Sequence, residues 1–392
     1  MAGFFRRSRL HSQRSDPMID GGHGGRLLEP GQIVDRYRVL ARIGEGGMAE
    51  VYQVRHVHLQ TLHALKVHTS VKRSIKVRFE REGRIQASIA HPNVVRVSDV
   101  IDLGERTGLV MDFIKIEHTL FALPFAYLGA FLAQGGMIPP RTFLLIATAF
   151  TGLRTAAMSL NRIIDREIDA MNPRTAGRHI PAGLISLREA YAIVIASLAV
   201  YFVSAYLINE TAFYLSPIPV ITAYIYPYLK RYTVLSHYVL GLNLAFAPMG
   251  GWIAVTNRFD PLGQDLLPFL IGVAVMFWVA GFDMIYALQD YEFDRKHGLH
   301  SFPAKYGIGA SRTMAFVNHT VFFAILSYAM LVMYQAGLLA RIGLAVIFLL
   351  IVAEHLVVRY GKNEKSIQIA FFYMNAALSS ALLIFTFLDV FL

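Results

Sequence analysis

The pattern of polar and apolar residues changes near residue 114. Before this point polar and apolar residues mix over short stretches, and after it long apolar runs follow one another. A helix of about 20 residues crosses a hydrocarbon layer of ~30 Å and satisfies its own backbone hydrogen bonds in lipid. The pattern therefore predicts an all-α, multi-pass membrane bundle. Its nine expected spans are residues 118–136, 142–160, 187–208, 212–229, 237–256, 266–288, 313–336, 339–358 and 367–390.

Residues 33–114 show the pattern of a small α+β unit. The stretch YRVLARIGEGGMAEVYQVRHVHLQTLHALKV predicts β-strands around a glycine-rich turn. Residues 1–32 are rich in Arg, Ser and Gly and lack the apolar stretch of a signal peptide, so we expect a disordered basic tail. The pattern thus predicts three regions, at 1–32, 33–114 and 115–392.

Composition supports a membrane protein and excludes some chemistry. The chain is 55% hydrophobic and 16% charged, whereas globular domains average about 25% charged. It contains no cysteine, which excludes disulfides, thiol catalysis and cysteine-bound zinc. The net charge of +10 favours membrane lipid or phosphorylated ligands as partners, and we expect no nucleic acid.

Positive charge is distributed unequally between the two sets of predicted loops. One set carries fourteen lysine and arginine residues between Arg162 and Lys365, and the opposite set carries only Arg141, Arg258 and Arg341. Because lysine and arginine accumulate in cytoplasmic loops, the first set is expected to face the cytoplasm. This predicts a protein of a bacterial inner membrane.

Two polar motifs follow apolar spans on that cytoplasmic side. The first is NRIIDREIDAMNPRTAGRHIPAG at 161–183, and the second is GFDMIYALQDYEFDRKHGLHSFPAKYG at 281–307. Helical spacing should align the polar residues of each motif on one helix face. These residues are Asn161, Asp165 and Asp169 in the first motif, and Asp283, Asp290 and Asp294 in the second.

Carboxylates beside cations at a membrane boundary are typical of a metal–diphosphate site. Mg²⁺ takes oxygen ligands and binds through a few carboxylates together with substrate phosphates, while Lys and Arg bind phosphate oxygens. A bland alternative is that acids at helix ends are simply solvated. A cation-coupled transporter is another alternative, but it should place its acids near the middle of the membrane, often within internal repeats.

The motifs resemble those of the UbiA superfamily of intramembrane prenyltransferases. The resemblance rests on N-R-x-x-D-R-x-x-D, the following N-P-R-T-x-x-R, and the later D-x-E-x-D-R. Lys115–Ala126 (KIEHTLFALPFA) and Tyr226–Arg231 (YPYLKR) are similar to other parts of that family. His179 departs from it, because many members have proline there. The resemblance covers about 115–392 and implies the family's nine-helix bundle.

The resemblance also implies roles for individual residues. Mg²⁺ would be held on a polyprenyl diphosphate by Asn161, Asp165, Asp169, Asp290 and Asp294, with Asp283 as an additional ligand, and the four acids Asp165, Asp169, Asp290 and Asp294 would be catalytic. The diphosphate or the acceptor carboxylate would be bound by Arg174, Arg178, Lys230 and Arg231. The allylic cation would be stabilised by tyrosine faces, for which the candidates are Tyr224, Tyr226, Tyr228 and Tyr286. The isoprenoid tail would leave sideways into lipid.

The implied enzyme transfers a polyprenyl group to an aromatic acid in lipid-quinone synthesis. The stretch DMIYALQDYEFDR resembles members that act on 4-hydroxybenzoate, which is the expected acceptor. It also resembles relatives of the futalosine route to menaquinone, which would make a naphthoate the acceptor. Both acceptors therefore stay open at this point.

Residues 33–114 resemble the small lobe of a bacterial Ser/Thr protein kinase. The resemblance rests on a glycine loop, then A-L-K, R-F-E-R-E-G and H-P-N-V-V in that order. The implied vestigial ATP motif consists of Gly44, Gly46, Val51, Lys66 and Glu82, with Ala49 in place of the third glycine. H-R-D-x-x-x-x-N and D-F-G are missing, so nothing positions a hydroxyl nucleophile or the second metal ligands. We expect a truncated fragment without kinase activity and with at most a residual site for ATP.

Overall fold

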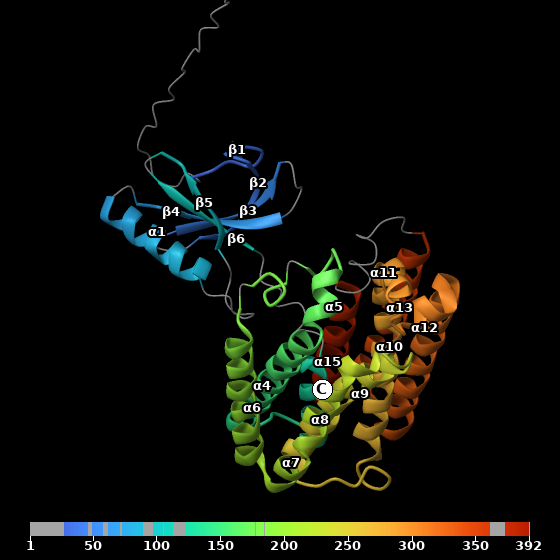
Figure 1. The fold of residues 1–392 in the computed structure, drawn as a ribbon. Helices are drawn as coiled ribbons and strands as arrows, with labels where there is room; N and C mark the ends of the chain where they lie inside the picture. The colour runs from blue at the N-terminus through green and yellow to red at the C-terminus, as the bar shows by residue number, and fades with distance from the viewer. Residues whose placement is uncertain are drawn as a thin grey trace, which may run out of the picture. The chain divides into compact units, whose positions relative to one another are not determined.

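The computed structural model describes most of the chain. The described residues are 27–45, 49–57, 62–70, 73–88, 97–104, 106–112, 122–176, 178–183, 185–360 and 373–391. The chain divides into two compact units, Met1–Phe113 and Ile114–Leu392 (Figure 1).

The described part of the first unit is an antiparallel sheet with one helix. The sheet has the order β1-β2-β3-β4-β6-β5, and its neighbours pair in antiparallel register. The strands are β1 (Ile33–Val34), β2 (Tyr37–Glu45), β3 (Ala49–His56), β4 (Leu62–His68), β5 (Val97–Asp102) and β6 (Thr107–Asp112). Alternate residues of β3, such as Tyr52 and Val54, are fully buried, as expected for a strand with one face on a core. Helix α1 (Arg73–Ser88) packs against β5 and β6, where Phe79 joins a small apolar cluster.

The second unit is a helical bundle. Its described helices are α3 (Leu123–Gln134), α4 (Pro140–Ile164), α5 (Arg166–Met171), α6 (Leu187–Ile208), α7 (Glu210–Leu215), α8 (Pro217–Leu229), α9 (Ser236–Thr256), α10 (Leu266–Tyr286), α11 (Tyr291–Lys296), α12 (Phe302–Tyr328), α13 (Leu338–Tyr360) and α15 (Asn375–Phe391). A 3₁₀ turn, η1 (Ala287–Asp290), joins α10 to α11, and a π-helical turn, η2 (Ala329–Met333), follows α12. Figure 1 shows the long helices roughly side by side, with α5 and α11 at one end and α7 at the other.

The described helices correspond to the nine expected spans, with differences in length. Six segments of the described residues are long and apolar enough to cross a membrane: α4, α6, α9, α10 through α11, α12 through η2, and α13. The expected span 212–229 is interrupted, because α7 ends at Leu215 and α8 begins at Pro217. Proline lacks the N–H that would continue α7 and is well suited to the first turn of a new helix. The start of the expected span 367–390 lies outside the described residues, and α15 covers the rest.

Small residues allow the helices to approach closely. A Cβ added at Gly251 of α9 would lie 1.8 Å from the carbonyl oxygen of Ala126 in α3, and one at Gly129 of α3 would lie 2.0 Å from that of Pro248 in α9. A Cβ at Gly241 of α9 would lie 2.3 Å from the carbonyl oxygen of Met276 in α10. Helices in lipid associate through such close backbone packing, because lipid tails are as apolar as leucine.

A hydrogen-bonded network lies within the buried core of the bundle. Trp278 of α10 is fully buried, and its Nε1 donates to Oδ1 of Asn375 in α15 at 2.8 Å. The ring of His319 in α12 lies 3.2 Å from the Trp278 carbonyl oxygen and 3.0 Å from the ring of His355 in α13. Carboxylate Oε2 of the buried Glu354 lies 3.8 Å from His319. Since buried polar groups need partners, this network links α10, α12, α13 and α15 in one arrangement.

Candidate active site

Both polar motifs lie at one end of the helical bundle, which we call the acidic end. It is formed by the ends of α4, α8 and α10 and by the short helices α5 and α11 (Figure 1). Contacts between distant parts of the chain hold it together: Lys230 after α8 bonds Asp165 after α4, and Arg174 bonds Asp290. The tertiary structure therefore brings the two motifs into one site.

Asp165 occupies the break between α4 and α5. Its side chain is 2% exposed. Lys230 Nζ donates to Oδ2, and Arg231 Nη2 lies 3.5 Å from Oδ1. Burial raises the pKa of the Asp165 carboxyl, and the Lys230 charge acts in the opposite direction. Arg231 is anchored in turn, because its Nη2 donates to the Ile164 carbonyl oxygen at 2.8 Å.

Asp169 and Arg178 form a second pair. Arg178 Nη1 lies 2.8 Å from each carboxylate oxygen of Asp169, which is 4% exposed. The loop between them is folded back by Thr175, whose hydroxyl donates to the Asp169 carbonyl oxygen at 3.0 Å. The motif N-P-R-T-x-x-R thus positions its last arginine over the last acid of the helix.

The second motif is held by residues of the first. Asp290 accepts hydrogen bonds at Oδ1 from Arg174 Nε at 2.8 Å and from Asn172 Nδ2 at 2.9 Å, and Arg174 Nη2 donates to its Oδ2. Arg174 Nη1 donates to the Tyr286 hydroxyl at 3.0 Å, and its guanidinium lies 5.3 Å from the centre of that ring. The arginine is therefore fixed by a carboxylate and an aromatic face together.

Asp283 and Asp294 have partners of their own. Asp283 Oδ2 lies 2.6 Å from Nδ1 of His237 at the start of α9, and His237 Nε2 accepts the Phe302 backbone N–H at 3.1 Å. Because Nε2 accepts, Nδ1 carries the proton and donates to Asp283. Asp294 is 9% exposed and accepts a hydrogen bond from the Ser301 side chain.

Neither set of acids lies on one continuous helix. Asp165 has φ −89° and ψ 3°, which separates α4 from α5, and the 3₁₀ turn η1 separates Asp283 from Asp294. A 3₁₀ turn has three residues instead of 3.6, so it rotates the following side chains. As a result Asp283 contacts α9 and Asp290 contacts the loop after α5. In the first motif the Asp165 N–H bonds the Asn161 carbonyl oxygen at 2.9 Å and the Asp169 N–H bonds that of Asp165 at 2.8 Å, so the one-turn spacing is kept across the break. The expected single face is corrected for the second motif alone.

The candidate metal ligands suit a hard cation such as Mg²⁺. All the candidate ligands are carboxylate or amide oxygens, and Oδ1 of Asp165 is buried with no hydrogen-bond donor among the described residues. Among the described residues, no three acidic or histidine side chains converge closely enough to hold a metal ion. Lysine and arginine instead neutralise Asp165, Asp169 and Asp290 separately.

A cavity of about 340 Å³ opens beside these ion pairs. Asn161, Arg178, Tyr226 and Tyr286 belong to its wall, and the wall continues along α4 to Arg154. Its lining residues are Ala122, Phe150, Leu153, Arg154, Ala157, Met158, Asn161, Arg162, Arg178, Pro219, Ala223, Tyr226, Leu240, Asn243, Leu244 and Tyr286. The wall is thus polar toward the acidic end and apolar deeper in the bundle.

The tyrosine candidates separate into two groups. Tyr226 and Tyr286 line the cavity, so their rings can face a ligand there. Tyr224 is 50% exposed, and Tyr228 packs beside Tyr224 and under Arg231, outside the cavity wall.

Four residues of the site were not recognised in the sequence. Asn172 and His237 bond acids of the second motif, and Arg154 and Arg162 line the cavity. Arg154 could have been predicted from the sequence, because it is a lone arginine inside an apolar span, seven residues before Asn161. Within the described ranges no carboxylate pairs with Arg154. The roles of Asn172 and His237 could not be predicted from the sequence, because their partners Asp290 and Asp283 are far away along the chain.

The nucleotide motif of the first unit is present in part. Lys66 Nζ lies 3.0 Å from Glu82 Oε1, so the structure brings the lysine and the glutamate together. Gly44 pairs with Val51 across β2 and β3, and Gly46 lies outside the described residues.

Two family models match the chain. The sequence model of the UbiA prenyltransferase family matches residues 122–376, and that of the protein kinase domain matches residues 37–134. A 4-hydroxybenzoate octaprenyltransferase of Actinobacillus pleuropneumoniae serotype 5b is 29% identical over 236 residues, which are 60% of this chain and 79% of that protein. A polyprenyl transferase of Arthrobotrys oligospora is 31% identical over 261 residues, which are 64% of this chain and 70% of that protein.

Solved structures share the fold of the bundle. The apo structure of a UbiA homolog from Aeropyrum pernix K1 has a TM-score of 0.64 and 37% identity, covering 71% of this chain and 99% of that one. A UbiA homolog from Archaeoglobus fulgidus bound to GPP and Mg²⁺ has a TM-score of 0.50 and 22% identity, covering 69% and 98%. These matches confirm the expected bundle fold and an enzyme rather than a transporter. The chain is a multi-pass membrane prenyltransferase that belongs to the UbiA prenyltransferase family.

Proposed function

We propose that this protein transfers a polyprenyl group from a polyprenyl diphosphate to 4-hydroxybenzoate, with Mg²⁺, at the acidic end of the bundle. The observation that carries the proposal is the cavity wall. It joins Asn161 and Arg178, which is paired with Asp169, to an apolar interior and to Arg154, for which the described residues offer no carboxylate partner. The loop charges favour a cytoplasmic position for this end in a bacterial inner membrane.

The ion pairs of the acidic end suit diphosphate binding, because their cations can exchange a carboxylate partner for a phosphate. Arg174, Arg178 and Lys230 each neutralise one carboxylate. A diphosphate offers these cations stronger acceptors, and the carboxylates are then released to metal ions. Asn161, Asp165, Asp169, Asp290 and Asp294 would hold Mg²⁺, with Asp283 held back by His237 as an outer member. Mg²⁺ supplies positive charge that stabilises the departing diphosphate.

Arg154 is the proposed partner of the acceptor carboxylate. It lies two turns before Asn161 on the same face of α4, within the cavity wall. A guanidinium in such a site binds a planar carboxylate with two parallel hydrogen bonds. A carboxylate at Arg154 would direct the aromatic ring toward the acidic end, where the allylic carbon of the donor is held.

The cavity also protects the reaction from water. The allylic C–O bond of the donor breaks, the ring carbon of the acceptor forms the new bond, and the ring then loses a proton. Tyr226 and Tyr286 present aromatic faces that stabilise positive charge on the allylic group. The apolar wall formed by Phe150, Leu153 and Leu244 limits capture of that cation by water.

Prenyl transfer by membranes containing the full chain tests this proposal. Geranyl diphosphate would be supplied with 4-hydroxybenzoate or with a naphthoate, with Mg²⁺ or with excess chelator, and the products would be identified by mass. We expect a prenylated 4-hydroxybenzoate that is lost with the chelator. A product only from the naphthoate would instead assign the enzyme to the futalosine route. Prenyl transfer without Mg²⁺ would contradict the metal assignment.

A further inference from the structure

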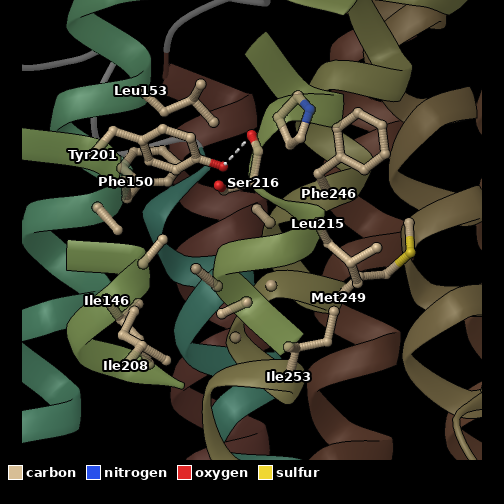
Figure 2. A pocket seen from close by; sticks show the side chains of 18 of the residues that line it. Ile146, Phe150, Leu153, Tyr201, Ile208, Leu215, Ser216, Phe246, Met249 and Ile253 are labelled. Atoms are coloured by element: carbon tan, nitrogen blue, oxygen red, sulfur yellow. Dashed lines mark hydrogen bonds between the residues drawn. The ribbon is translucent and has the colours of Figure 1, made fainter. Parts of the chain in front are cut away.

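An apolar cavity lies among α4, α6, α7, α8 and α9, and Figure 2 shows the side chains around it. The Tyr201 hydroxyl in its wall donates to the Ser216 carbonyl oxygen at 3.1 Å. Phe150 and Leu153 line this cavity and also the cavity beside the ion pairs of the acidic end. The two cavities therefore belong to the same site.

A groove formed by α12, η2 and α13 lies at the opposite end of the bundle. Helix α12 begins at the acidic end, because Ser301 before it bonds Asp294 there. The last turns of α12 and the first turn of α13 are therefore at the other end. The groove is lined by Phe323, Ser327, Leu331, Arg341 and Leu344. Nothing in the proposed reaction uses it.

The turn after α12 fixes Arg341 beside the groove. The π-helical turn η2 is closed by the Tyr334 N–H, which donates to the Ala329 carbonyl oxygen at 3.0 Å. As the chain turns back into α13, the Ala336 carbonyl oxygen accepts a hydrogen bond from Arg341 Nε at 2.9 Å. The two Nη nitrogens of Arg341 have no hydrogen-bond or ion-pair partner among the described residues. An arginine that only extends into water would not need this anchor.

The charge of Arg341 is not balanced by an acid in the described part of the chain. Asp389 of α15 is engaged elsewhere, because its carboxylate accepts two backbone N–H groups at the start of α13, at 2.8 and 3.2 Å. Arg258, by contrast, has its Nε 2.9 Å from Oδ1 of Asp265. The groove thus has an uncompensated positive charge at its mouth.

The rest of the groove is mostly apolar and runs inward from Arg341. Leu344 is 4% exposed, whereas Leu331 is 42% exposed. Phe323 precedes Leu331 by eight residues, which corresponds to about 12 Å along the helix axis. One leaflet accounts for about 15 Å of a ~30 Å hydrocarbon layer. The groove therefore has the depth of one leaflet, with a cation near the headgroups and apolar side chains below.

We propose that this groove binds one phospholipid with an anionic headgroup, in the leaflet opposite the acidic end. The phosphate would accept hydrogen bonds from the Nη nitrogens of Arg341, and one acyl chain would lie along Phe323 and Leu344. An anionic headgroup is favoured because it brings no ammonium group to compete with the guanidinium for the phosphate. This site is separate from the proposed reaction and goes beyond it.

Two substitutions test the two parts of the site. Arg341→Gln removes the positive charge, and Ser327→Leu narrows the groove while leaving Arg341 in place. Arg141→Gln is the matched control. Arg141 lies in the first turn of α4 at the same end of the bundle, and its Nη2 donates to the Leu207 carbonyl oxygen at 3.0 Å, outside the groove.

The measurement is native mass spectrometry of the purified, delipidated full-length proteins, titrated with phosphatidylglycerol, phosphatidylcholine or inorganic phosphate. Wild-type protein should bind one phosphatidylglycerol saturably and at least about ten-fold more tightly than phosphatidylcholine. Arg341→Gln should weaken phosphatidylglycerol binding about ten-fold or more, as for a lost hydrogen bond to a charged group. Ser327→Leu should weaken the binding of both lipids, and Arg141→Gln should stay within about two-fold of wild type.

Several outcomes would overturn the proposal. Melting temperatures identify the folded variants, and unchanged phosphatidylglycerol affinity in either folded groove variant would contradict the site. Equal losses in Arg341→Gln and Arg141→Gln would indicate general attraction between charges instead. Displacement of the lipid by inorganic phosphate would make Arg341 a site for a free anion. A dimer that Ser327→Leu separates would assign the groove to a second copy of this chain.

Discussion

At the scale of single residues, three acids of the acidic end are each neutralised by lysine or arginine. Asp165 is the most buried of the paired acids, and Lys230 and Arg231 approach it from after α8. An ion pair as buried as this one contributes little net stability compared with an apolar pair. Its retention in a lipid-embedded bundle is therefore better explained by ligand binding than by folding.

Asp165→Asn tests the role of that carboxylate. Loss of the charge should lower kcat/KM for prenyl transfer about 10²- to 10³-fold, as for the removal of one group that stabilises developing charge. Glu167→Gln is the control, because Glu167 lies two residues away with a side chain that is 78% exposed. It should retain activity within about two-fold. Equal losses in both variants, or none in Asp165→Asn, would contradict the site assignment.

Arg154→Met tests acceptor binding. The methionine keeps the apolar length of the side chain but removes the guanidinium, so KM for 4-hydroxybenzoate should rise about ten-fold or more, the lower range for a hydrogen bond to a charged group. The KM for the prenyl diphosphate should stay near wild type, because Arg154 lies seven residues from Asn161 along α4. A selective loss of donor affinity would place Arg154 with the diphosphate instead.

At the scale of elements, broken helices determine where the acids point. A continuous α10–α11 helix would place Asp283, Asp290 and Asp294 in a single row, whereas the turn η1 gives them different partners. The break at Asp165 keeps the one-turn spacing of the first motif. Beside these breaks the bundle contains a frame of α3, α9 and α10, which pack backbone to backbone at glycine.

Gly251→Ala tests that frame. The new Cβ would lie 1.8 Å from the Ala126 carbonyl oxygen, so α3 and α9 must separate. We expect a loss of about 1–3 kcal/mol in stability, which is the usual range for overpacking, together with a lower melting temperature in detergent. Gly250→Ala is the neighbouring control, since its Cβ meets nothing within 4 Å. Similar melting temperatures for both variants would argue against close packing of α3 and α9.

At the scale of the whole molecule, the chain joins a kinase-like sheet unit to a prenyltransferase bundle. The Lys66–Glu82 pair is in place, but the motifs of a kinase large lobe are missing from the sequence. ATP binds between two kinase lobes, so one lobe offers only part of its site. We therefore propose that residues 33–114 contribute nothing to the transfer chemistry.

Deletion of Met1–Phe113 tests this view. Ile114–Leu392 contains every residue assigned to the acidic end and to the cavity beside it. Its prenyl transfer rate in membranes, per amount of folded protein, should lie within about two-fold of the full chain. Transfer only by the full chain, with the shorter protein folded, would make the kinase-like unit a working part of the enzyme.

The sequence alone determined the membrane bundle, the family and most of the charged residues of the site. Apolar runs of membrane length permit few structures other than helices, and the spacing in N-R-x-x-D-R-x-x-D is local information that the sequence displays directly. Only the tertiary structure decided which acid meets which cation, because Asp165 and Lys230 or Arg174 and Asp290 are far apart along the chain. It also decided the cavity beside the ion pairs, since empty space among helices is a property of their packing.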